Sequence, residues 1–336
     1  MSYFNGNSFL VTGGAGFIGS KIAETLAARD KYNITIADNL FRGKLDNFLQ
    51  KIIDEENIKF INADFTDPKS FDLFDKNYDH VYLLASVVGV KYTEEIPDEL
   101  IRINTSLILN TLEWLKQSQC KKALFSSTSE CYAGTIDSFD FAIPTPEDIP
   151  LCIADIHNPR FTYAVTKLLG ESGFYHYGKV HGFETTTIRY HNVYGPRMGF
   201  KHVIPQVIQR FLKGEQDFEI FGFNQTRSFN YIDDAVKGTI LAMESSKTDG
   251  EIIHIGDSND EILIEDLVKY IGKKMNYKGE YRLVSAPKGS VSRRCPDISK
   301  AKKLTGYKPE INWREGVKRT MDWYINYIQS GGDIFE

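Results

Sequence analysis

The stretch Ser8-Phe9-Leu10-Val11-Thr12-Gly13-Gly14-Ala15-Gly16-Phe17-Ile18-Gly19 decides the fold, because it reads as a buried strand, a glycine-rich turn and the start of a helix. Glycines allow a tight turn and let the backbone come close to a phosphate group. The helix that follows presents free N–H groups and the positive end of its dipole. The stretch therefore predicts that Gly13, Gly16, Phe17, Ile18 and Gly19 bind the phosphates of a dinucleotide, the alternative being a purely structural turn.

Acidic residues follow the next two predicted strands. Asp38 ends the second strand about 20 residues beyond the turn, where a carboxylate binds the adenosine ribose hydroxyls. Such a carboxylate repels a 2′-phosphate, so NAD is favoured over NADP, and Asn39 lies beside it. Asp64 either meets the adenine or caps the next helix, and we expect Phe65 to cover the adenine ring.

The first half of the chain alternates apolar strand-like runs with amphipathic stretches, which is typical of a parallel sheet covered on both faces. The strand-like runs are Ser8–Thr12, Asn33–Asp38, Ile58–Ala63, His80–Leu84, Lys122–Ser126 and Thr185–Arg189. The helix-like stretches include Phe17–Arg29, Asp98–Ser118, Arg160–His181, Val203–Lys213 and Trp313–Gln329.

We therefore expect an α/β fold with a Rossmann-type doubly wound parallel sheet and a smaller C-terminal α/β substrate-binding domain. The alternation ends after Arg189, and residues 190–200 read as a loop. The expected NAD-binding domain is 1–189, with 227–257 returning to it. Residues 190–226 and 258–336 are expected to form the second domain.

Composition excludes several classes of protein. The 336 residues contain 40 Lys and Arg against 45 Asp and Glu, and the net charge of −5 argues against a nucleic-acid partner. No apolar run is long enough for a membrane span, and the first strand begins too early to leave room for a signal peptide. The cysteines at 120, 131, 152 and 295 lack disulfide or metal spacing, so we expect free thiols, no metal and a cytoplasmic location.

Tyr163 and Lys167 lie four residues apart in a helix-like stretch and so share a face. The fifth strand leads into Thr128 and Glu130, at the sheet edge where ligands of open parallel sheets bind. Lowering a tyrosine pKa from about 10 to about 7 takes about 4 kcal/mol. A cation about 4–5 Å away supplies roughly 3–4 kcal/mol, so Lys167 with an oxidised nicotinamide suffices to make Tyr163 a base. The alternative is an ordinary surface Tyr–Lys pair.

Together these features resemble the extended short-chain dehydrogenase/reductase family, in its nucleotide-sugar epimerase/dehydratase branch. The resemblance covers nearly the whole chain and rests on Thr12–Ser20, Asp38-Asn39, Tyr163-x-x-x-Lys167, Asn192–Arg197, Arg227–Asp234 and Pro296–Ala301. It implies that NAD oxidises C4 of a nucleotide-diphosphate sugar, with Tyr163 as base, Lys167 as its electrostatic partner and Thr128 orienting the sugar hydroxyl. It also implies a homodimer paired through residues 98–117 and 160–181.

By the same resemblance, Asn192 and Arg227 bind the substrate diphosphate. This role suits Arg227 physically, because a guanidinium forks onto phosphate oxygens. The alternative for Arg227 is an ion pair with Asp233 or Asp234.

The triplet Thr128-Ser129-Glu130 resembles that of 4,6-dehydratases and UDP-glucuronate decarboxylases more than that of simple 4-epimerases. Glu130 would then remove a C5 proton or position a C6 carboxylate, the alternative being a local turn cap. Many 4-epimerases carry Arg-Pro-Gly-Asp where this chain has Pro287-Lys288-Gly289-Ser290. Arg293 and Arg294 offer a replacement, and Arg294 aligns best with an arginine thought to assist decarboxylation.

Two loops flank the expected site. The fourth strand ends near Leu83 and Ala85, which we expect to border the cofactor, and Val88 and Lys91 follow as candidate sugar contacts. Residues 133–158 form an acidic insert, which we interpret as a substrate-covering loop.

Four outcomes of C4 oxidation stay open. Glu130 favours dehydration or decarboxylation, family frequency favours epimerisation, and net dehydrogenation releases the keto sugar. A non-catalytic NAD-binding sensor requires a damaged Tyr–Lys pair, whereas Tyr163 and Lys167 are both present. The long C-terminal region and Arg227 argue against an ordinary short-chain alcohol dehydrogenase.

Overall fold

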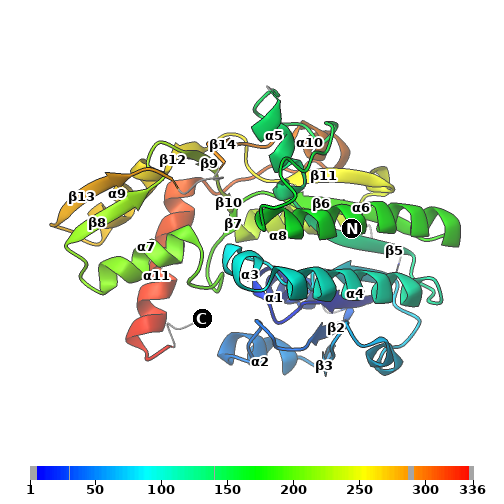
Figure 1. Ribbon diagram of the computed structural model, residues 1–336. Helices are drawn as coiled ribbons and strands as arrows, with labels where there is room; N and C mark the ends of the chain where they lie inside the picture. The colour runs from blue at the N-terminus through cyan, green and yellow to red at the C-terminus, as the bar shows by residue number, and fades with distance from the viewer. Residues whose placement is uncertain (1–5, 30, 140, 287–290, 333–336) are drawn as a thin grey trace.

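The computed structural model describes residues 6–29, 31–139, 141–286 and 291–332, and its centre is a seven-stranded sheet (Figure 1). Every neighbouring pair is parallel, in the order β11-β6-β5-β4-β1-β2-β3. The strands are β1 Ser8–Thr12, β2 Asn33–Asp38, β3 Ile58–Asn62, β4 His80–Leu83, β5 Lys122–Thr128, β6 Glu184–Tyr190 and β11 Glu251–Ile255. The expected Rossmann-type α/β fold is confirmed.

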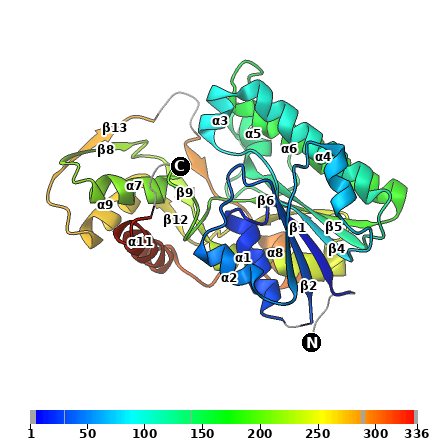
Figure 2. The ribbon, with the colours of Figure 1, turned by 90° about the horizontal axis from the view of Figure 1, so that it is seen from below.

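Helices cover both faces of this sheet, as Figure 2 shows. Helices α1 and α8 pack together on one face, and α4 and α6 pack together on the other. The α-helices of this part are α1 Phe17–Ala27, α2 Asn47–Ile53, α3 Val90–Glu95, α4 Pro97–Leu115, α5 Ala133–Ser138, α6 Arg160–His181, α8 Ile232–Glu244 and α10 Ser299–Thr305. Short 3₁₀ helices are η1 Pro68–Leu73, η2 Ser129–Tyr132 and η3 Ser246–Thr248. Within the described ranges, no helix combines the length and apolar character that crossing a membrane requires.

The remaining elements gather beside the large sheet, at the left of Figure 1. The helices are α7 Val203–Leu212, α9 Ile264–Lys274 and α11 Trp313–Gln329. The strands are β7 Val193–Tyr194, β8 Asp217–Phe221, β9 Thr226–Ser228, β10 Asn230–Tyr231, β12 Glu261–Leu263, β13 Glu280–Val284 and β14 Arg293–Arg294. They form the sheets β10-β7, β12-β9-β14 and β13-β8. The expectation of a loop throughout 190–200 was wrong at β7, because β7 pairs with β10.

Alternate residues of the central strands feed two separate cores, one on each face of the sheet. Phe9 and Val11 of β1 belong to one core, and Leu10 belongs to the other. The first core continues into the C-terminal elements, where it includes Phe218 and Val317. The two parts of the chain are therefore held by shared apolar packing.

The insert 133–158 begins with α5 and then runs to the edge of the large sheet. Thr145 N–H donates to the Cys295 carbonyl at 2.9 Å, and Asp297 N–H donates to the Thr145 carbonyl at 2.8 Å. The Glu147 carboxylate accepts from His254 N–H of β11 at 2.8 Å. The middle of the insert therefore packs on the edge strand and on the segment after Arg294, and its expected role as a substrate cover stays a prediction.

Candidate active site

The glycine turn leaves an open cradle at the start of α1. Gly13 has φ +66°, and a Cβ there would lie 2.7 Å from Ala85 N. A Cβ on Gly19 would lie 2.3 Å from the Gly13 carbonyl oxygen, so the turn and helix pack too closely for any side chain. Among the described residues no side chain caps α1, which leaves its first N–H groups free for an anion. This arrangement fits the diphosphate of a dinucleotide.

Asp38 ties the end of β2 to this turn. Its Oδ2 accepts from Ala15 N–H at 3.0 Å, and its Oδ1 accepts from Leu40 N–H at 2.8 Å. Burial raises the pKa of Asp38, and the two N–H donors oppose that rise. Asn39 is exposed beside it, and its Oδ1 accepts from Phe41 N–H at 3.0 Å. The expected ribose-binding carboxylate thus lies at the glycine turn.

The end of β3 differs in part from expectation. Asp64 is exposed and accepts from Thr66 N–H at 2.9 Å, so it forms a local turn, while Asp67 caps η1. The helix-cap alternative for Asp64 was therefore wrong. The Phe65 side chain is buried, with its ring 5.5 Å from that of Phe74, which leaves little of its surface to cover an adenine. The expectation for the Phe65 ring was wrong, because the ring is packed inside an aromatic core.

Tyr163 and Lys167 lie where β5 ends. Lys167 Nζ donates to the Ser126 carbonyl at 2.8 Å and lies 5.6 Å from the centre of the Tyr163 ring. Burial lowers the pKa of Lys167 to about 8 and raises the pKa of Tyr163. Thr128 Oγ1 accepts from Glu130 N–H at 3.3 Å, which leaves its own O–H free to donate. The structure brings Tyr163 and Lys167 together near the end of the strand that carries Thr128.

A buried ion pair fixes α6 against the sheet and so fixes Tyr163 relative to Thr128. Arg189 of β6 donates to both carboxylate oxygens of Glu171 of α6, each at 2.8 Å. Ser127 Oγ, next to Thr128 on β5, donates to Glu171 at 2.5 Å. Both members of the pair are almost fully buried, which makes this link strongly directional.

Glu130 lies between two arginines from distant parts of the chain. Arg160, the first residue of α6, reaches it at 2.7 Å, and Arg294 of β14 reaches it at 2.5 Å. Although burial raises the pKa of Glu130, Arg294 and Arg160 together lower it to about 2. Glu130 is therefore an ionised carboxylate at neutral pH and a poor proton donor.

Arg160 is a site residue that the sequence prediction missed. A signal was available, because positions 160, 163 and 167 follow the i, i+3, i+7 spacing of one helix face. Arg160 also approaches Asp137 of the insert at 3.7 Å. The helix face that carries Tyr163 thus also carries a cation.

Arg227 of β9 lies opposite Arg294 of β14. Its guanidinium donates to the Val291 carbonyl at 2.6 Å, and burial with neighbouring Arg294 lowers its pKa to about 10. The alternative of an ion pair was wrong: Asp233 pairs with Lys21 at 3.3 Å, and Asp234 accepts backbone N–H groups of residues 310 and 311. Three guanidinium groups therefore gather around one carboxylate.

Asn192 lies beside this cluster, at the break between β6 and β7. Its backbone has φ +38°, and its side-chain amide donates to the Ser228 carbonyl at 2.9 Å. Ser228 follows Arg227 on β9, so Asn192 is tied to the strand that presents the arginine.

The residues predicted in the segment after β4 lie in different surroundings. Leu83 is buried at the end of β4, and Ala85 packs on the glycine turn. Lys91 lies on α3, half exposed, and pairs with Glu95 on the same helix at 3.4 Å. The ammonium of Lys91 lies at the helix surface, and its expected sugar contact stays a prediction. The Val88 carbonyl accepts from Arg42, which the sequence prediction also missed.

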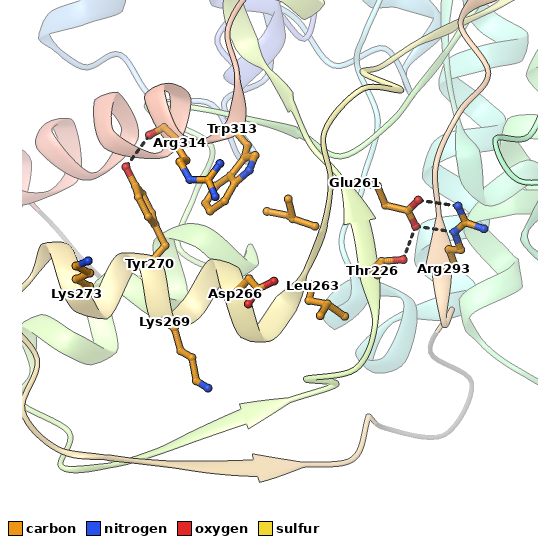
Figure 3. Close-up of a pocket in the computed structure, with 11 residues that line it drawn as sticks. Thr226, Glu261, Leu263, Asp266, Lys269, Tyr270, Lys273, Arg293, Trp313 and Arg314 are labelled. Atoms are coloured by element: carbon orange, nitrogen blue, oxygen red, sulfur yellow. Dashed lines mark hydrogen bonds and ion pairs between the residues drawn. The ribbon is translucent and has the colours of Figure 1, made fainter.

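Arg293 faces away from the site. Consecutive strand residues point to opposite faces, so Arg293 and Thr226 lie opposite the face that carries Arg294 and Arg227. There they line a pocket of about 770 Å³, shown in Figure 3, where Glu261 pairs with Arg293 at 2.7 Å. This pocket contains none of the residues predicted to react. The stretch 287–290 lies outside the described residues.

Comparisons with known proteins agree with this geometry. Residues 9–256 match the model of the NAD dependent epimerase/dehydratase family. The UDP-N-acetyl-alpha-D-glucosaminuronate decarboxylase of Bacillus cytotoxicus is 34% identical, over 94% of this chain and 97% of its own. A putative UDP-glucose 4-epimerase of Methanocaldococcus jannaschii is 33% identical, over 94% and 98%.

A solved structure is similarly close. The UDP-glucuronic acid 4-epimerase of Bacillus cereus, in complex with UDP-glucuronic acid and NAD, superposes with a TM-score of 0.82 at 28% identity. The match covers 95% of this chain and 99% of that protein. These relatives are named for different reactions, so the residues of the site must distinguish between them.

Proposed function

This chain belongs to the NAD-dependent epimerase/dehydratase family of nucleotide-sugar-modifying enzymes, and from that premise we propose that it oxidises C4 of a nucleotide-diphosphate uronate and decarboxylates the product. The cofactor in this proposal is NAD, held at the glycine turn and Asp38. The substrate diphosphate lies at Asn192 and Arg227.

The arginine cluster around Glu130 carries this proposal. In a dehydratase Glu130 would have to remove a proton from C5, and a carboxylate with a pKa of about 2 is a weak base for that step. Arg160 and Arg294 instead offer forked donors to a second carboxylate. A C6 carboxylate would bind there, since three guanidinium groups face two carboxylates, Glu130 and Asp137, and so keep a surplus of positive charge. The relatives from B. cytotoxicus and B. cereus are both named for uronates.

The residues divide the chemistry as follows. NAD, when bound, supplies the group that takes the hydride from C4 and later returns it. Thr128 orients the C4 hydroxyl. The proton of that sugar hydroxyl moves to Tyr163 Oη as the hydride leaves C4. Lys167 stabilises the Tyr163 phenolate before it takes up this proton.

The product of that oxidation is a β-keto acid, with its carboxylate held by Arg160 and Arg294. The C5–C6 bond breaks to release carbon dioxide, and its electron pair moves onto the C4 oxygen. Tyr163 returns its proton to that oxygen and forms an enol. The enol then takes a proton from solvent at C5 and gives its O–H proton back to Tyr163. Tyr163 donates this proton to the C4 oxygen when the hydride returns to C4. The arginines thus orient the leaving carboxylate beside the acid–base pair.

A 4-epimerase acting on the same uronate is the second candidate. The B. cereus structure favours it, because that enzyme binds UDP-glucuronic acid without losing the carboxylate in its named reaction. Arg160 and Arg294 serve either outcome.

Incubation with UDP-glucuronate, UDP-N-acetylglucosaminuronate, UDP-glucose and UDP-N-acetylglucosamine tests the proposal, with products weighed by mass spectrometry. We expect a uronate to lose carbon dioxide, and the Tyr163→Phe variant to leave it intact. An unchanged mass with inverted C4 identifies the epimerase. Loss of water from a neutral sugar contradicts both candidates.

The proposal includes a homodimer in the cytoplasm. Helices α4 and α6 expose large apolar side chains, including Ile101, Leu109, Val165 and Leu169, on the sheet face that they cover together. All four cysteines are free thiols, which supports a reducing compartment. The proposed domains are 1–189 with 227–257 for the cofactor, and 190–226 with 258–336 for the nucleotide sugar.

A further inference from the structure

The loops that follow β2 and β4 leave the sheet on either side of β1, because the strand order there is β4-β1-β2. Both loops pack on the glycine turn. A Cβ on Gly13 would lie 2.7 Å from Ala85 N in the loop after β4. A Cβ on Gly43, in the loop after β2, would lie 2.6 Å from Ala15 Cβ. The two loops therefore flank the cradle in front of α1.

The loops meet again at Arg42. Its Nη1 donates to the Val88 carbonyl at 2.9 Å, and its Cζ lies 6.0 Å from the centre of the Tyr92 ring. The Phe41 ring contacts the same tyrosine, at 5.9 Å between ring centres. We call the contacts of Arg42 with Val88 and Tyr92 the Arg42 bridge. The glycine turn, the loop after β2 and the loop after β4 therefore contact one another in a ring around the cradle.

A second cation reaches Tyr92 from the C-terminal part of the chain. Lys201 Nζ, just before α7, lies 5.3 Å from the centre of the Tyr92 ring. Neighbouring Arg197 anchors the same segment to α2 through Asp46 at 2.8 Å. Two positive side chains thus meet at Tyr92, just after the loop that packs on the glycine turn.

The Arg42 bridge by itself is weakly held. Arg42 is exposed, and a solvent-exposed charged side chain gains little from one contact. A guanidinium has five N–H donors, and the Val88 carbonyl takes one of them. Arg42 is therefore able to move aside and still has donors for phosphate oxygens.

We propose that Arg42 closes over the diphosphate of bound NAD and holds the cofactor in place between turnovers. The inference rests on the proposed NAD site, but not on the sugar or the reaction. The diphosphate would lie between the N-terminus of α1 and the guanidinium, with Val88 and Tyr92 fixing the arginine from the far loop. Arg42 is then a cofactor-retention residue that acts before any sugar binds.

Release of NAD, measured without sugar, tests this role. Protein loaded with radiolabelled NAD is chased with excess unlabelled NAD, and the label that remains is followed over time. We expect Arg42→Ala to release NAD at least tenfold faster than the unchanged protein, and Arg42→Lys to lie between them. Arg282→Ala, which removes an exposed arginine on β13, is the matched control and should release NAD at the unchanged rate.

Equal release rates for Arg42→Ala and the unchanged protein overturn the proposal. A parallel titration with NADP distinguishes another role for the same guanidinium. If Arg42→Ala weakens NADP binding and leaves NAD release unchanged, Arg42 contacts a 2′-phosphate, and the proposal is wrong. If the unchanged protein binds neither dinucleotide, both the proposed NAD site and the proposed role of Arg42 are wrong. A failure of the uronate reaction alone leaves the release measurement intact.

Discussion

Burial acts in opposite directions on the two members of the Tyr163–Lys167 pair. It raises the pKa of the tyrosine and lowers that of the lysine to about 8, because both charged forms lose solvation. The ordinary lysine pKa is about 10.4, so Lys167 is charged at pH 7 but loses its charge well before an exposed lysine does. The stabilising cation for the Tyr163 anion therefore disappears as pH rises through about 8.

This loss predicts an alkaline limit to activity. We expect kcat/KM to fall above pH 8, with an apparent pKa near 8, in steady-state rates measured between pH 6 and 10. Lys167→Arg keeps its charge throughout that range, so its alkaline limb should vanish even if its overall rate is lower. A limb that stays at the same pH in Lys167→Arg would exclude Lys167 as its source.

Glu130 gives a second prediction, at acid pH. Its pKa is lowered to about 2 from an ordinary value of about 4.3, so its ion pairs stabilise the fold above pH 4.3 and are lost as pH falls towards 2. Removing the carboxylate leaves the guanidinium groups of Arg160 and Arg294 without it, which costs on the order of 1–3 kcal/mol. We expect Glu130→Gln to melt at lower temperature than the unchanged protein at pH 7.

The difference in melting temperature should shrink between pH 4 and pH 2.5, because the carboxylate of the unfolded chain, with its ordinary pKa of about 4.3, takes up a proton in that range while the folded one stays largely ionised. Thermal unfolding followed by circular dichroism at several pH values checks this. A difference that does not depend on pH would mean that side-chain shape, rather than charge, matters at Glu130. Glu99→Gln, at an exposed carboxylate paired with Arg102 on α4, is the control and should change little.

At this scale, local sequence spacing predicted residues whose partners are near in the chain. Tyr163 and Lys167 lie on one helix face, and Asp38 lies at the end of its strand, as their positions indicate. The position of Glu130 between Arg160 and Arg294 required contacts across 30 and 164 residues, which no local pattern encodes. The Phe65 expectation failed for a similar reason, because Phe74 and its neighbours form an aromatic core that the local sequence does not reveal.

The bounds of the elements also divide into those set by nearby residues, which the sequence predicted, and those set by distant residues, which it did not. Helices α6 and α11 begin and end as predicted, since Pro159 precedes α6, Gly182 in a left-handed conformation ends it, and Asn312 caps α11. Strands β5 and β6 extend beyond their predicted ends, because Thr128 pairs with Tyr190 across the sheet. Strand pairing therefore places Thr128 at the sheet edge, and sequence periodicity alone ended that strand two residues early.

The glycine turn yields a prediction about an element junction. Gly13→Ala forces a Cβ into the backbone of Ala85 at a residue with φ +66°, so both conformation and packing oppose it. Gly182→Ala is the matched control, since Gly182 has φ +82° and nothing within 4 Å of an added Cβ. We expect Gly182→Ala to cost about 1–2 kcal/mol from backbone conformation alone. Gly13→Ala should cost about 1–3 kcal/mol more from overpacking.

Urea unfolding measures both costs, and titration with NAD shows whether the cradle survives. NAD affinity should fall in Gly13→Ala and stay constant in Gly182→Ala. Unchanged NAD affinity in a folded Gly13→Ala protein would argue that the turn does not bind the cofactor phosphates.

At the scale of the whole molecule, one apolar core joins the sheet to the C-terminal elements, so the arginines of β9 and β14 lie at a fixed position relative to Glu130 of η2 and Arg160 of α6. The sequence predicted both regions but not their docking. That docking depends on side chains far apart in the chain, such as Arg197, which reaches Asp46 and Ser20. The insert adds a further link between β11 and the segment after Arg294.

The proposed dimer is tested at the same scale. Leu109 of α4 and Leu169 of α6 are partly exposed on the face that these helices form, and a second copy would bury them. Leu169→Glu places a charge in such an interface, and burying it without a partner costs several kcal/mol. We expect light scattering after gel filtration to report a dimer for the unchanged protein and a monomer for Leu169→Glu. Leu212→Glu, at a similarly exposed leucine on α7, should remain dimeric.

If Leu169→Glu is dimeric, the interface does not lie on α6. If the unchanged protein is a monomer, the proposed dimer is wrong. Because α6 carries Arg160, Tyr163 and Lys167, a folded monomer with reduced turnover would further show that pairing of this helix supports the active site.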